Sequence, residues 1–354
     1  MSPAALGLSP RELAPRRAAN VAAFLSARGL EPAWLAGVLG EHVGDGELLL
    51  TSSPVHGLAN PSSDLDFICI RWQAAGEPPV ATKVFAGGHH LEIVVFSVEQ
   101  VERNLAELAT LAAAPLEGTV RAFRSWDERL EPKRKQTERI VNGVTLQGTM
   151  PYVEALPSLG IVWSRASLQN AIEHAAYLYL AEAAGETRGR LGYAINAVLS
   201  LADSLLSAGG DVYSTRKWTL LRWARAALST CAADPAVREA AAALDALRAR
   251  LAEGRGGLAD ACFRLVTRFA GVVVGVPRLV VVAEVAGEVA QYAFLPGATL
   301  LLGWQSSLVV RGAGLSGTLE FDFDLPTQID AEQARAWLAA LRAGLASIRV
   351  AYGG

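Results

Sequence analysis

The chain has 354 residues, 51% of them hydrophobic and 19% charged, so it is long enough for two or three domains and too apolar to be disordered. A formal net charge of −3 argues against nucleic acid as the main partner, because surfaces that bind a phosphate backbone are basic. The N-terminus lacks the apolar core of a signal peptide, and no uncharged apolar run is long enough to predict a membrane span.

The three cysteines, Cys69, Cys231 and Cys262, lie far apart and have neither metal-binding nor disulfide spacing. Isolated thiols fit a reducing compartment, so a cytoplasmic protein is expected. The oligomeric state stays open, a homodimer included.

The N-terminal part is expected to alternate helices and short strands. Residues 17–28 predict a helix that ends at Gly29, and a second short helix is expected near residues 32–39. The apolar run 48–50 then predicts a short buried strand, and the small residues 51–53 predict a turn after it.

Residues 62–70 predict a second strand, whose first part carries two carboxylates. Asp64 and Asp66 are two positions apart and should point to one face, while Leu65 and Phe67 point into the core. Neighbouring carboxylates on a buried strand repel one another and are costly to desolvate unless a cation neutralises them. A hard divalent cation with oxygen ligands is one interpretation, and a solvent-facing edge strand is the other.

This stretch resembles the active-site signature of the DNA polymerase β-type nucleotidyltransferases, in the branch of the aminoglycoside and lincosamide enzymes. The family pattern is an apolar strand, Gly-Ser, three residues, Gly, a loop and Asp-x-Asp. Ser52 replaces the usual first glycine, and its Cβ either hinders the approach of a phosphate or tightens the turn. His56 stands where these enzymes often carry an arginine. The matching residues are Ser52-Ser53, Pro54-Val55-His56, Gly57 and Asp64-Leu65-Asp66.

The resemblance also implies a third carboxylate on a neighbouring strand. Residues 84–96 contain a Gly-Gly turn followed by a predicted strand with a single acid, Glu92, in an apolar run. An ionised glutamate is rarely buried unpaired, so Glu92 either completes the group of acids or reaches solvent from the start of the strand. His89 and His90 are interpreted as turn or strand-end residues, because zinc would need more nitrogen and sulfur ligands.

The resemblance implies a metal-dependent nucleotidyltransferase that moves a nucleoside monophosphate from a triphosphate to a hydroxyl of a small-molecule acceptor, releasing pyrophosphate. Two Mg²⁺ ions would be the cofactors. The acids Asp64, Asp66 and Glu92 would bind these ions and carry catalysis, and Ser52, Ser53 and Gly57 would hold the triphosphate. Two alternatives remain: transfer to a protein or tRNA, and a degenerate fold kept as a binding module, which Ser52 and the missing arginine favour.

The middle of the chain is expected to be helical. Ser97 and Gln100 predict a capping box for a helix through residue 113. The charged residues 128–139 are interpreted as a domain boundary, in which Lys133, Arg134 and Lys135 either attract a triphosphate or form the solvated face of a linker; the linker is favoured. Apolar residues then recur at three and four spacing over residues 164–270.

Within this helical region, Ser214 or Thr215 is expected to cap a helix that begins with Arg216 and Lys217. A helix N-terminus with two adjacent cations favours phosphate oxygens, so both cations are candidate nucleotide contacts. Relatives of the resembling family carry a Lys-Trp-like element that faces the nucleotide, which agrees with this interpretation. The alternative is a pair of surface cations beside a core tryptophan, Trp218.

The last 80 residues contain short strand-like segments split by Gly and Pro, followed by a helix predicted over residues 331–347 with Asp330 as its cap. No family resemblance is found there. The expected fold class is α+β: a small mixed-sheet nucleotidyltransferase core, a helical domain and a C-terminal β-rich α+β domain. Their expected bounds are residues 1–128, 129–274 and 275–354, with the helical domain closing over the nucleotide.

Overall fold

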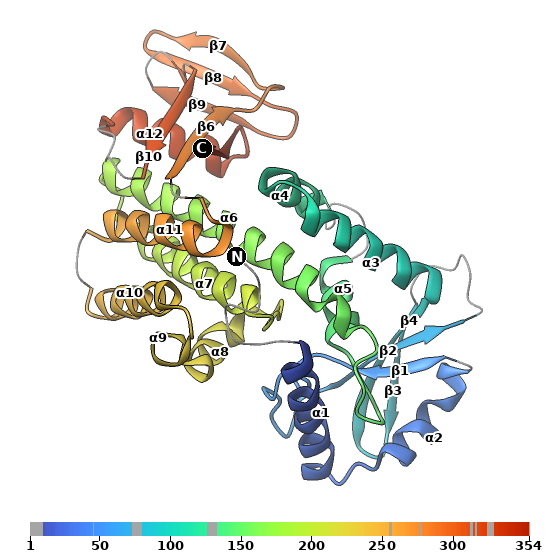
Figure 1. Ribbon diagram of the computed structural model, residues 1–354. Coiled ribbons are helices and arrows are strands. Elements are labelled where there is room, and N and C mark those ends of the chain that lie inside the picture. The colour runs from blue at the N-terminus through green and yellow to red at the C-terminus, as the bar shows by residue number, and fades with distance from the viewer. Residues whose placement is uncertain are drawn as a thin grey trace. The chain divides into compact units, whose positions relative to one another are not determined.

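The computed structural model describes residues 10–44, 46–72, 80–125, 133–254, 257–276, 278–311, 314–315, 317–323 and 329–353. The chain forms two compact units (Figure 1). The N-terminal unit comprises Ser2–Ser164 and Leu206–Arg222, and the C-terminal unit comprises Arg165–Leu205 and Trp223–Gly354. The expected division into three domains stays a prediction, and its first boundary, at residue 128, lies outside the described residues.

A five-stranded mixed sheet forms the centre of the N-terminal unit, with the strand order β3-β4-β2-β1-β5. Strands β2 and β4 are parallel, and the pairs β3–β4, β1–β2 and β1–β5 are antiparallel. The expected α+β class is confirmed, as are the strands expected at residues 48–50 and after the Gly-Gly turn at residues 87–88; the strand expected over residues 62–70 begins only at Leu65. The strands are β1 (Glu47–Leu50), β2 (Leu65–Arg71), β3 (Val80–Ala86), β4 (His89–Ser97) and β5 (Val144–Thr145).

Helices cover both faces of this sheet, which explains why β2 is apolar at nearly every position. On one face, Leu65 and Phe67 pack in a core with residues of α1 and α2. On the other face, Ile68 packs in a core that includes Val101 of α3 and Ile140 of α5. Figure 1 shows α1 and α2 on one side of the strands and α3 and α5 on the other. The helices are α1 (Pro10–Ala27), α2 (Pro32–Val43), α3 (Val98–Ala113), α4 (Leu116–Ser125) and α5 (Lys133–Asn142).

The start of α3 confirms the predicted capping box. The Ser97 hydroxyl accepts from the Gln100 backbone N–H at 3.2 Å, and the Gln100 side chain accepts from the Ser97 N–H at 2.8 Å. Both contacts satisfy N–H groups that the first turn of a helix leaves without an intrahelical partner.

The solvated linker predicted for residues 128–139 is wrong over residues 133–139, which belong to helix α5 (Lys133–Asn142). In this helix, Glu138, Ile140 and Val141 are buried. The helix is stabilised because Ile140 packs in the core under the sheet and Glu138 accepts hydrogen bonds from Asn142 in the same helix and from Ser214, 76 positions away. Residues 126–132 lie outside the described part of the chain.

Helices make up most of the chain between residues 156 and 274, as predicted. Asp234 caps α10 by accepting from the Ala236 N–H at 2.8 Å, and Pro235 occupies the first helical position. The helices are α6 (Leu156–Ala183), α7 (Arg190–Ala208), α8 (Thr219–Ala226), α9 (Leu228–Cys231), α10 (Pro235–Ala252) and α11 (Leu258–Val274), with short 3₁₀ turns η2 (Val153–Ala155) and η3 (Arg216–Trp218).

Helix α7 is the single helix in the described part of the chain that is long and apolar enough to cross a membrane by length and composition. Of its most apolar 18-residue window, 56% is buried inside the structure. The core helices of soluble proteins have the same length and composition, and we interpret α7 as such a buried helix.

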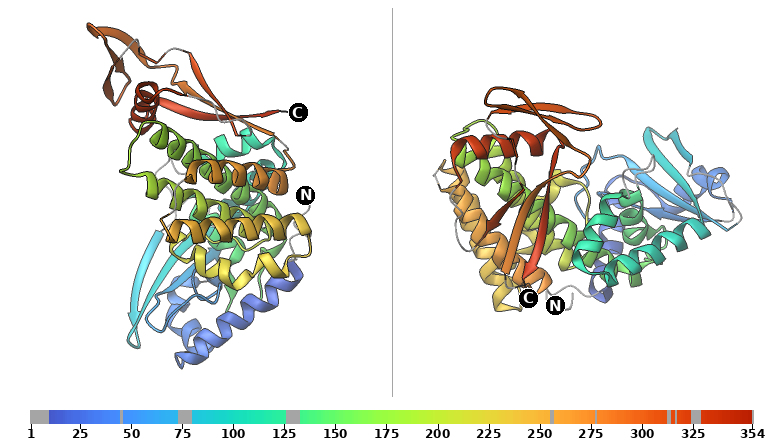
Figure 2. Two further views of the ribbon diagram at one scale, coloured as in Figure 1. Left: turned by 90° about the vertical axis from the view of Figure 1, so that its left-hand side faces the viewer. Right: turned by 90° about the horizontal axis from the view of Figure 1, so that it is seen from above.

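The C-terminal part of the chain forms two three-stranded antiparallel sheets and one helix. One sheet has the order β10-β6-β11 and the other the order β7-β8-β9. Helix α12 lies against β9 and β11, and Figure 2 shows these elements from two further sides. The elements are β6 (Arg278–Val285), β7 (Ala290–Leu295), β8 (Ala298–Leu302), β9 (Ser307–Arg311), β10 (Thr318–Asp322), α12 (Ala331–Arg342) and β11 (Ala346–Gly353).

The predicted cap of the last helix is confirmed, but its predicted end is wrong. Asp330 accepts from the N–H groups of Glu332 and Gln333, both at 2.9 Å. The helix ends at Arg342 rather than at residue 347, because Gly344 adopts φ +69°, a conformation that suits glycine after a helix. Residues 346–353 instead form β11, which pairs with β6.

Candidate active site

Two of the three predicted catalytic acids are paired across neighbouring strands. Asp66 on β2 is in register with Glu92 on β4, and in-register residues of a parallel pair point to the same face. Both side chains are half-buried, whereas Leu65 is fully buried on the opposite face, as the alternation of the sequence predicts. Asp64 is exposed and lies just before β2, so the prediction that the strand already includes it is wrong.

Asp66 has a cationic partner that the sequence interpretation missed. Arg139 Nη2 of α5 donates to Asp66 Oδ2 at 3.2 Å. The two side chains are 13% and 18% exposed, so the pair is partly desolvated and open to solvent on one side. Arg139 lies in the charged stretch that is interpreted from the sequence as a linker, and for this reason it is not predicted as a site residue.

The turn after β1 starts directly beside Asp66. The backbone N–H and the hydroxyl of Thr51 both donate to the Asp66 carbonyl oxygen, at 2.9 and 3.0 Å. Further along, the Leu58 N–H donates to the Ser53 carbonyl oxygen at 2.9 Å. The turn predicted to hold a triphosphate therefore begins beside the strand that carries Asp66, whose in-register partner is Glu92.

Ser52 combines two features that are unusual in a structural residue. Its φ is +65°, in the left-handed region that favours glycine, and it is 5% exposed. Its buried hydroxyl has no hydrogen-bond partner among the described residues. Backbone strain and an unsatisfied polar group are both costly, and both occur frequently at ligand sites.

Gly57 closes the same turn with φ +63°. A Cβ at this position would lie 3.0 Å from Asn20 Oδ1, and the Asn20 side chain is itself held by the Val55 carbonyl oxygen at 3.0 Å. Backbone conformation and space therefore both require glycine here.

His56, in the same turn, points into a buried polar network. Its side chain is 2% exposed and stacks on the Tyr213 ring, with centroids 4.3 Å apart. One ring nitrogen lies 3.6 Å from Glu138 Oε1, and the other lies 3.5 Å from Asp211 Oδ1. The residue that replaces the arginine of the resembling family thus lies between two carboxylates, an environment that does not favour a phosphate contact.

The carboxylates of this network stay ionised although they are buried. Burial alone would raise the pKa of Glu138, but the nearby His56 and the hydrogen bond from Asn142 lower it. Burial likewise opposes ionisation of Asp211, but the charge of Arg222, 3.2 Å away, holds its pKa well below its ordinary value. The network therefore fixes the turn against α5 and residues 211–215.

A third cation completes the network from α1. Burial lowers the pKa of Arg17 to about 10, and the nearby carboxylates of Asp211 and Glu138 partly offset this effect. The Arg17 guanidinium donates to the side-chain oxygen of Asn142, whose amide nitrogen donates to Glu138 at 2.7 Å. Charges of both signs are thus paired within the N-terminal unit.

The predicted helix cap before Arg216 is wrong. Thr215 makes no side-chain capping bond, and the Ser214 hydroxyl instead donates to Glu138 Oε2 at 3.1 Å. Arg216 and Lys217 are exposed in the 3₁₀ turn η3, where the Lys217 ammonium lies 5.2 Å from the centroid of the Trp218 ring. Their contact with phosphate stays a prediction.

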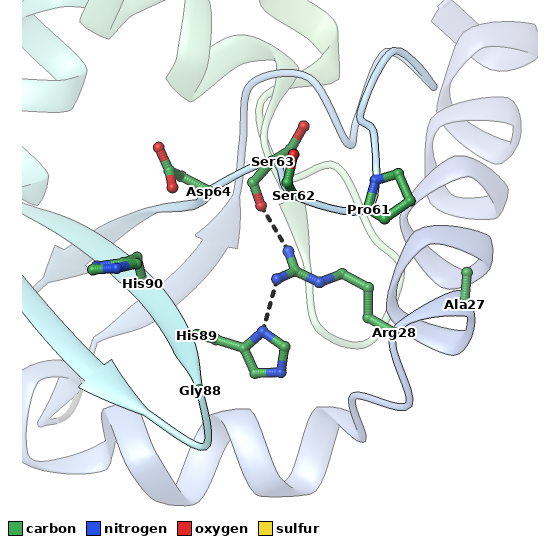
Figure 3. Close-up of a pocket in the computed structure, with 9 residues that line it drawn as sticks. All are labelled: Ala27, Arg28, Pro61, Ser62, Ser63, Asp64, Gly88, His89 and His90. Atoms are coloured by element: carbon green, nitrogen blue, oxygen red, sulfur yellow. Dashed lines mark hydrogen bonds between the residues drawn. The ribbon is translucent and has the colours of Figure 1, made fainter.

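A cavity of about 500 Å³ lies beside Asp64 (Figure 3). Its walls are Ala27 and Arg28 at the end of α1, residues 61–64 and residues 88–90. Arg28 donates to the Ser63 carbonyl oxygen at 2.6 Å and lies 2.7 Å from His89 Nδ1. A guanidinium only donates, so His89 Nδ1 accepts. The sequence prediction missed Arg28, because a single arginine at a helix end has no distinguishing pattern.

The acids fit Mg²⁺ by their chemistry, since carboxylate oxygens are its preferred protein ligands. Among the residues that the structure describes, however, no three His, Cys, Asp or Glu side chains are grouped so that they could hold a metal ion. The Asp66 carboxylate is paired with Arg139 in this arrangement. Binding of a metal through Asp66 therefore requires Arg139 to leave it.

Comparison with known proteins assigns the chain to a family. A family model described as a family of unknown function (DUF6001) matches residues 8–352. The chain belongs to this family. No curated protein matches the chain. Among solved structures, a nucleotidyltransferase-like protein from Exiguobacterium sibiricum 255-15 matches at 12% sequence identity, over 69% of this chain and 74% of that chain, with a TM-score of 0.30. A likeness this low carries no functional argument, so the function of this DUF6001 member is argued from its site.

Proposed function

We propose that this DUF6001 protein is a metal-dependent nucleotidyltransferase that moves a nucleoside monophosphate to a hydroxyl of a small molecule. The observation that carries the proposal is the position of the in-register acids Asp66 and Glu92 beside the turn that contains Ser52. Ser52 has a strained backbone and a buried hydroxyl without a hydrogen-bond partner among the described residues. The two like-charged acids lie near it in the same sheet. Each is costly by itself, and a metal-bound triphosphate would compensate for both.

Each predicted site residue has a role in this proposal. Asp66 and Glu92 would hold Mg²⁺, and Asp64 would have to move toward them to complete the metal site. The ion when bound neutralises charge on the triphosphate. The acceptor hydroxyl attacks the α-phosphorus, the bond to the β-phosphate oxygen breaks, pyrophosphate leaves, and Glu92 accepts the hydroxyl proton. Backbone N–H groups of the turn and the Ser52 hydroxyl would bind phosphate oxygens. The phosphate contacts in the proposal are Ser52, Ser53, Gly57, Arg216 and Lys217.

The cavity beside Asp64 is the proposed acceptor site. Its volume of about 500 Å³ lies within the usual range for small-molecule sites. The Arg28 guanidinium supplies donors for acceptor oxygens. Asp64 lines the cavity, and in this proposal it also contributes to the metal site. A small acceptor in the cytoplasm agrees better with the net charge of −3 than a tRNA does.

A thermal-shift series tests the proposal. ATP, CTP, GTP and UTP are each added with and without Mg²⁺, and a ligand at a hundred times its dissociation constant should stabilise the protein by about 2.7 kcal/mol. We expect a Mg²⁺-dependent shift with at least one nucleotide, followed by pyrophosphate release once an acceptor hydroxyl is supplied. The absence of a Mg²⁺-dependent shift with all four nucleotides would contradict the proposal.

One observation favours a second candidate, a degenerate nucleotidyltransferase fold that serves as a binding module. The Asp66–Arg139 pair already neutralises one of the acids without a metal. This candidate predicts that Mg²⁺ and nucleotides together give no shift and that pyrophosphate is never released. A protein or tRNA acceptor is a third option, and a gel-shift assay with tRNA tests the tRNA acceptor.

A further inference from the structure

We propose that Arg139 is an exchangeable counter-ion of Asp66: a divalent cation displaces its guanidinium, which then binds the triphosphate. This inference rests on the proposed function and adds a phosphate-binding residue to it. It also explains how the charge of a metal-binding carboxylate is compensated when no metal is bound.

The position of Arg139 follows from two adjacent residues of α5. Glu138 lies 3.6 Å from His56, in the turn proposed to hold phosphate, and Arg139 contacts Asp66 at 3.2 Å. The same turn is bonded to the Asp66 carbonyl oxygen through Thr51. Arg139 therefore contacts the acid pair directly, and the residue before it in α5 lies against the turn.

The chemistry of the pair makes the exchange feasible. A metal ion and a guanidinium compete for the same carboxylate oxygens, and the structure gives this pair a single hydrogen bond, from Nη2 to Oδ2. Asp66 and Arg139 are 18% and 13% exposed, so a hydrated ion can approach without unfolding. An arginine keeps its charge at all relevant pH values, and its planar fork suits phosphate oxygens.

The exchange requires a side-chain rotation and no movement of the helix. Ile140 and Val141, which follow Arg139, are fully buried, and Glu138 is held by Asn142 and Ser214. The backbone of α5 at residue 139 is therefore fixed. The long arginine side chain can reorient because it is partly exposed.

The test measures metal and phosphate binding separately in Arg139→Gln, in Arg139→Lys and in the control Lys135→Gln. Lys135 is exposed on the solvated face of α5, lies one turn earlier and carries the same charge, and the proposal gives it no contact with phosphate. The affinity for Mn²⁺ alone is measured by electron paramagnetic resonance, and the affinity for inorganic triphosphate with Mg²⁺ by calorimetry. Circular dichroism establishes that each variant is folded.

We expect opposite effects in Arg139→Gln. Mn²⁺ alone should bind about two- to fivefold more tightly, the change expected when a competing, partly exposed ion pair is removed. Inorganic triphosphate with Mg²⁺ should bind at least about tenfold more weakly, because a charge-assisted phosphate contact is lost. Arg139→Lys should keep the native Mn²⁺ affinity and lose part of the triphosphate affinity, and Lys135→Gln should change neither.

The outcomes separate this inference from the function on which it rests. Equal Mn²⁺ affinity of the native protein and Arg139→Gln would overturn the exchange while leaving the metal site intact. An unchanged triphosphate affinity in Arg139→Gln would overturn the phosphate contact. A native protein that binds no Mn²⁺ at all would overturn the proposed function, and the inference with it. If Arg139→Gln does not fold, Arg139→Lys decides through its triphosphate affinity.

Discussion

Asp66 on β2 and Glu92 on β4 lie directly opposite each other in the parallel part of the sheet, and Lys83 on β3 lies opposite Glu92 on the other side. Neighbouring strands are about 4.8 Å apart, so this row brings two carboxylates together on one face. Arg139 contacts the Asp66 end of the row, and Lys83 occupies its outer end. Cations therefore flank a pair of acids whose mutual repulsion would otherwise weaken the sheet.

Neutralising either acid should abolish nucleotide transfer and leave the fold intact. We expect Asp66→Asn and Glu92→Gln to reduce pyrophosphate release by more than about a hundredfold, the scale typical of groups that stabilise charge in a transition state. The melting temperature of Glu92→Gln should stay close to native. Asp66→Asn should lose no more than about 1 kcal/mol, because its ion pair with Arg139 is partly exposed.

Glu117→Gln is the matched control, since Glu117 is an exposed acid of α4 that pairs with Arg121. It should release pyrophosphate at the native rate. Native activity in Asp66→Asn would disprove the assignment of the acid pair.

Two substitutions, one that removes a glycine and one that introduces a glycine, test the backbone strain in the turn after β1 that is proposed to hold phosphate. Gly57→Ala should destabilise the N-terminal unit by about 1–3 kcal/mol, because an L-residue at φ +63° is strained and the new Cβ meets Asn20. Ser52→Gly should instead stabilise it by up to about 1 kcal/mol, since it relieves the left-handed conformation. Hydrogen exchange of the β1 and β2 amides under native conditions measures both effects within the unit.

Gly37→Ala serves as the control for these exchanges. Gly37 lies in α2, and a Cβ there meets nothing within 4 Å. We expect it to stabilise the protein by up to about 1 kcal/mol, as alanine does inside a helix. An equal response of Gly37→Ala and Gly57→Ala would refute the argument from strain.

The parts of the fold that the sequence predicts are those with local signals. The apolar run that forms β1 and the alternation of Leu65, Asp66 and Phe67 indicate their strands without any knowledge of the rest of the chain. The same holds for the caps at Ser97 and Asp330, whose partners lie within three residues. Such signals can be read from the sequence because the side chain and its partner belong to one short segment.

The parts that the sequence misses depend on contacts between distant segments. Glu138 can be buried because Asn142 and Ser214 donate hydrogen bonds to it, whereas a charged stretch by itself indicates a solvated linker. Arg139 is recognised as a site residue only through its contact with Asp66, which is 73 positions away in the sequence. The sequence predicts Ser214 as a helix cap, but in the structure its hydroxyl donates a hydrogen bond to Glu138. For the same reason, the cavity beside Arg28 could not be predicted.

The buried carboxylate of Glu138 should make the N-terminal unit sensitive to acid. Its pKa is lower in the folded state than the ordinary value of 4.5, so the folded state binds fewer protons than the unfolded state near that pH. The stability that Glu138 contributes is therefore present above about pH 4.5 and is lost as the pH falls through the folded pKa. Between pH 6 and 3, the unfolding free energy of Glu138→Gln should fall less steeply than that of the native protein, by up to about 1.4 kcal/mol per pH unit.

Urea unfolding at a series of pH values measures this slope, and Glu117→Gln controls for the loss of one surface carboxylate. An identical slope in the native protein and Glu138→Gln would contradict the assignment of acid sensitivity to this network.

The three cysteines should differ strongly in reactivity. Cys231 is exposed, whereas Cys69 and Cys262 are buried. Burial raises the pKa of the Cys262 thiol to about 12, and the thiolate is the reactive form. At pH 8, iodoacetamide should therefore label Cys231 more than about a thousandfold faster than Cys262, whose labelling requires opening of its helix.

Mass spectrometry of labelled peptides over time measures the three rates. Cys231→Ser should remove the fast phase and leave the slow ones unchanged, and urea should make the two remaining thiols react rapidly. Labelling of Cys262 in the native protein at a rate comparable to that of Cys231 would show that α11 opens readily. That result would contradict the structure, in which Cys262, Phe263, Val266 and Phe269 of α11 are all buried.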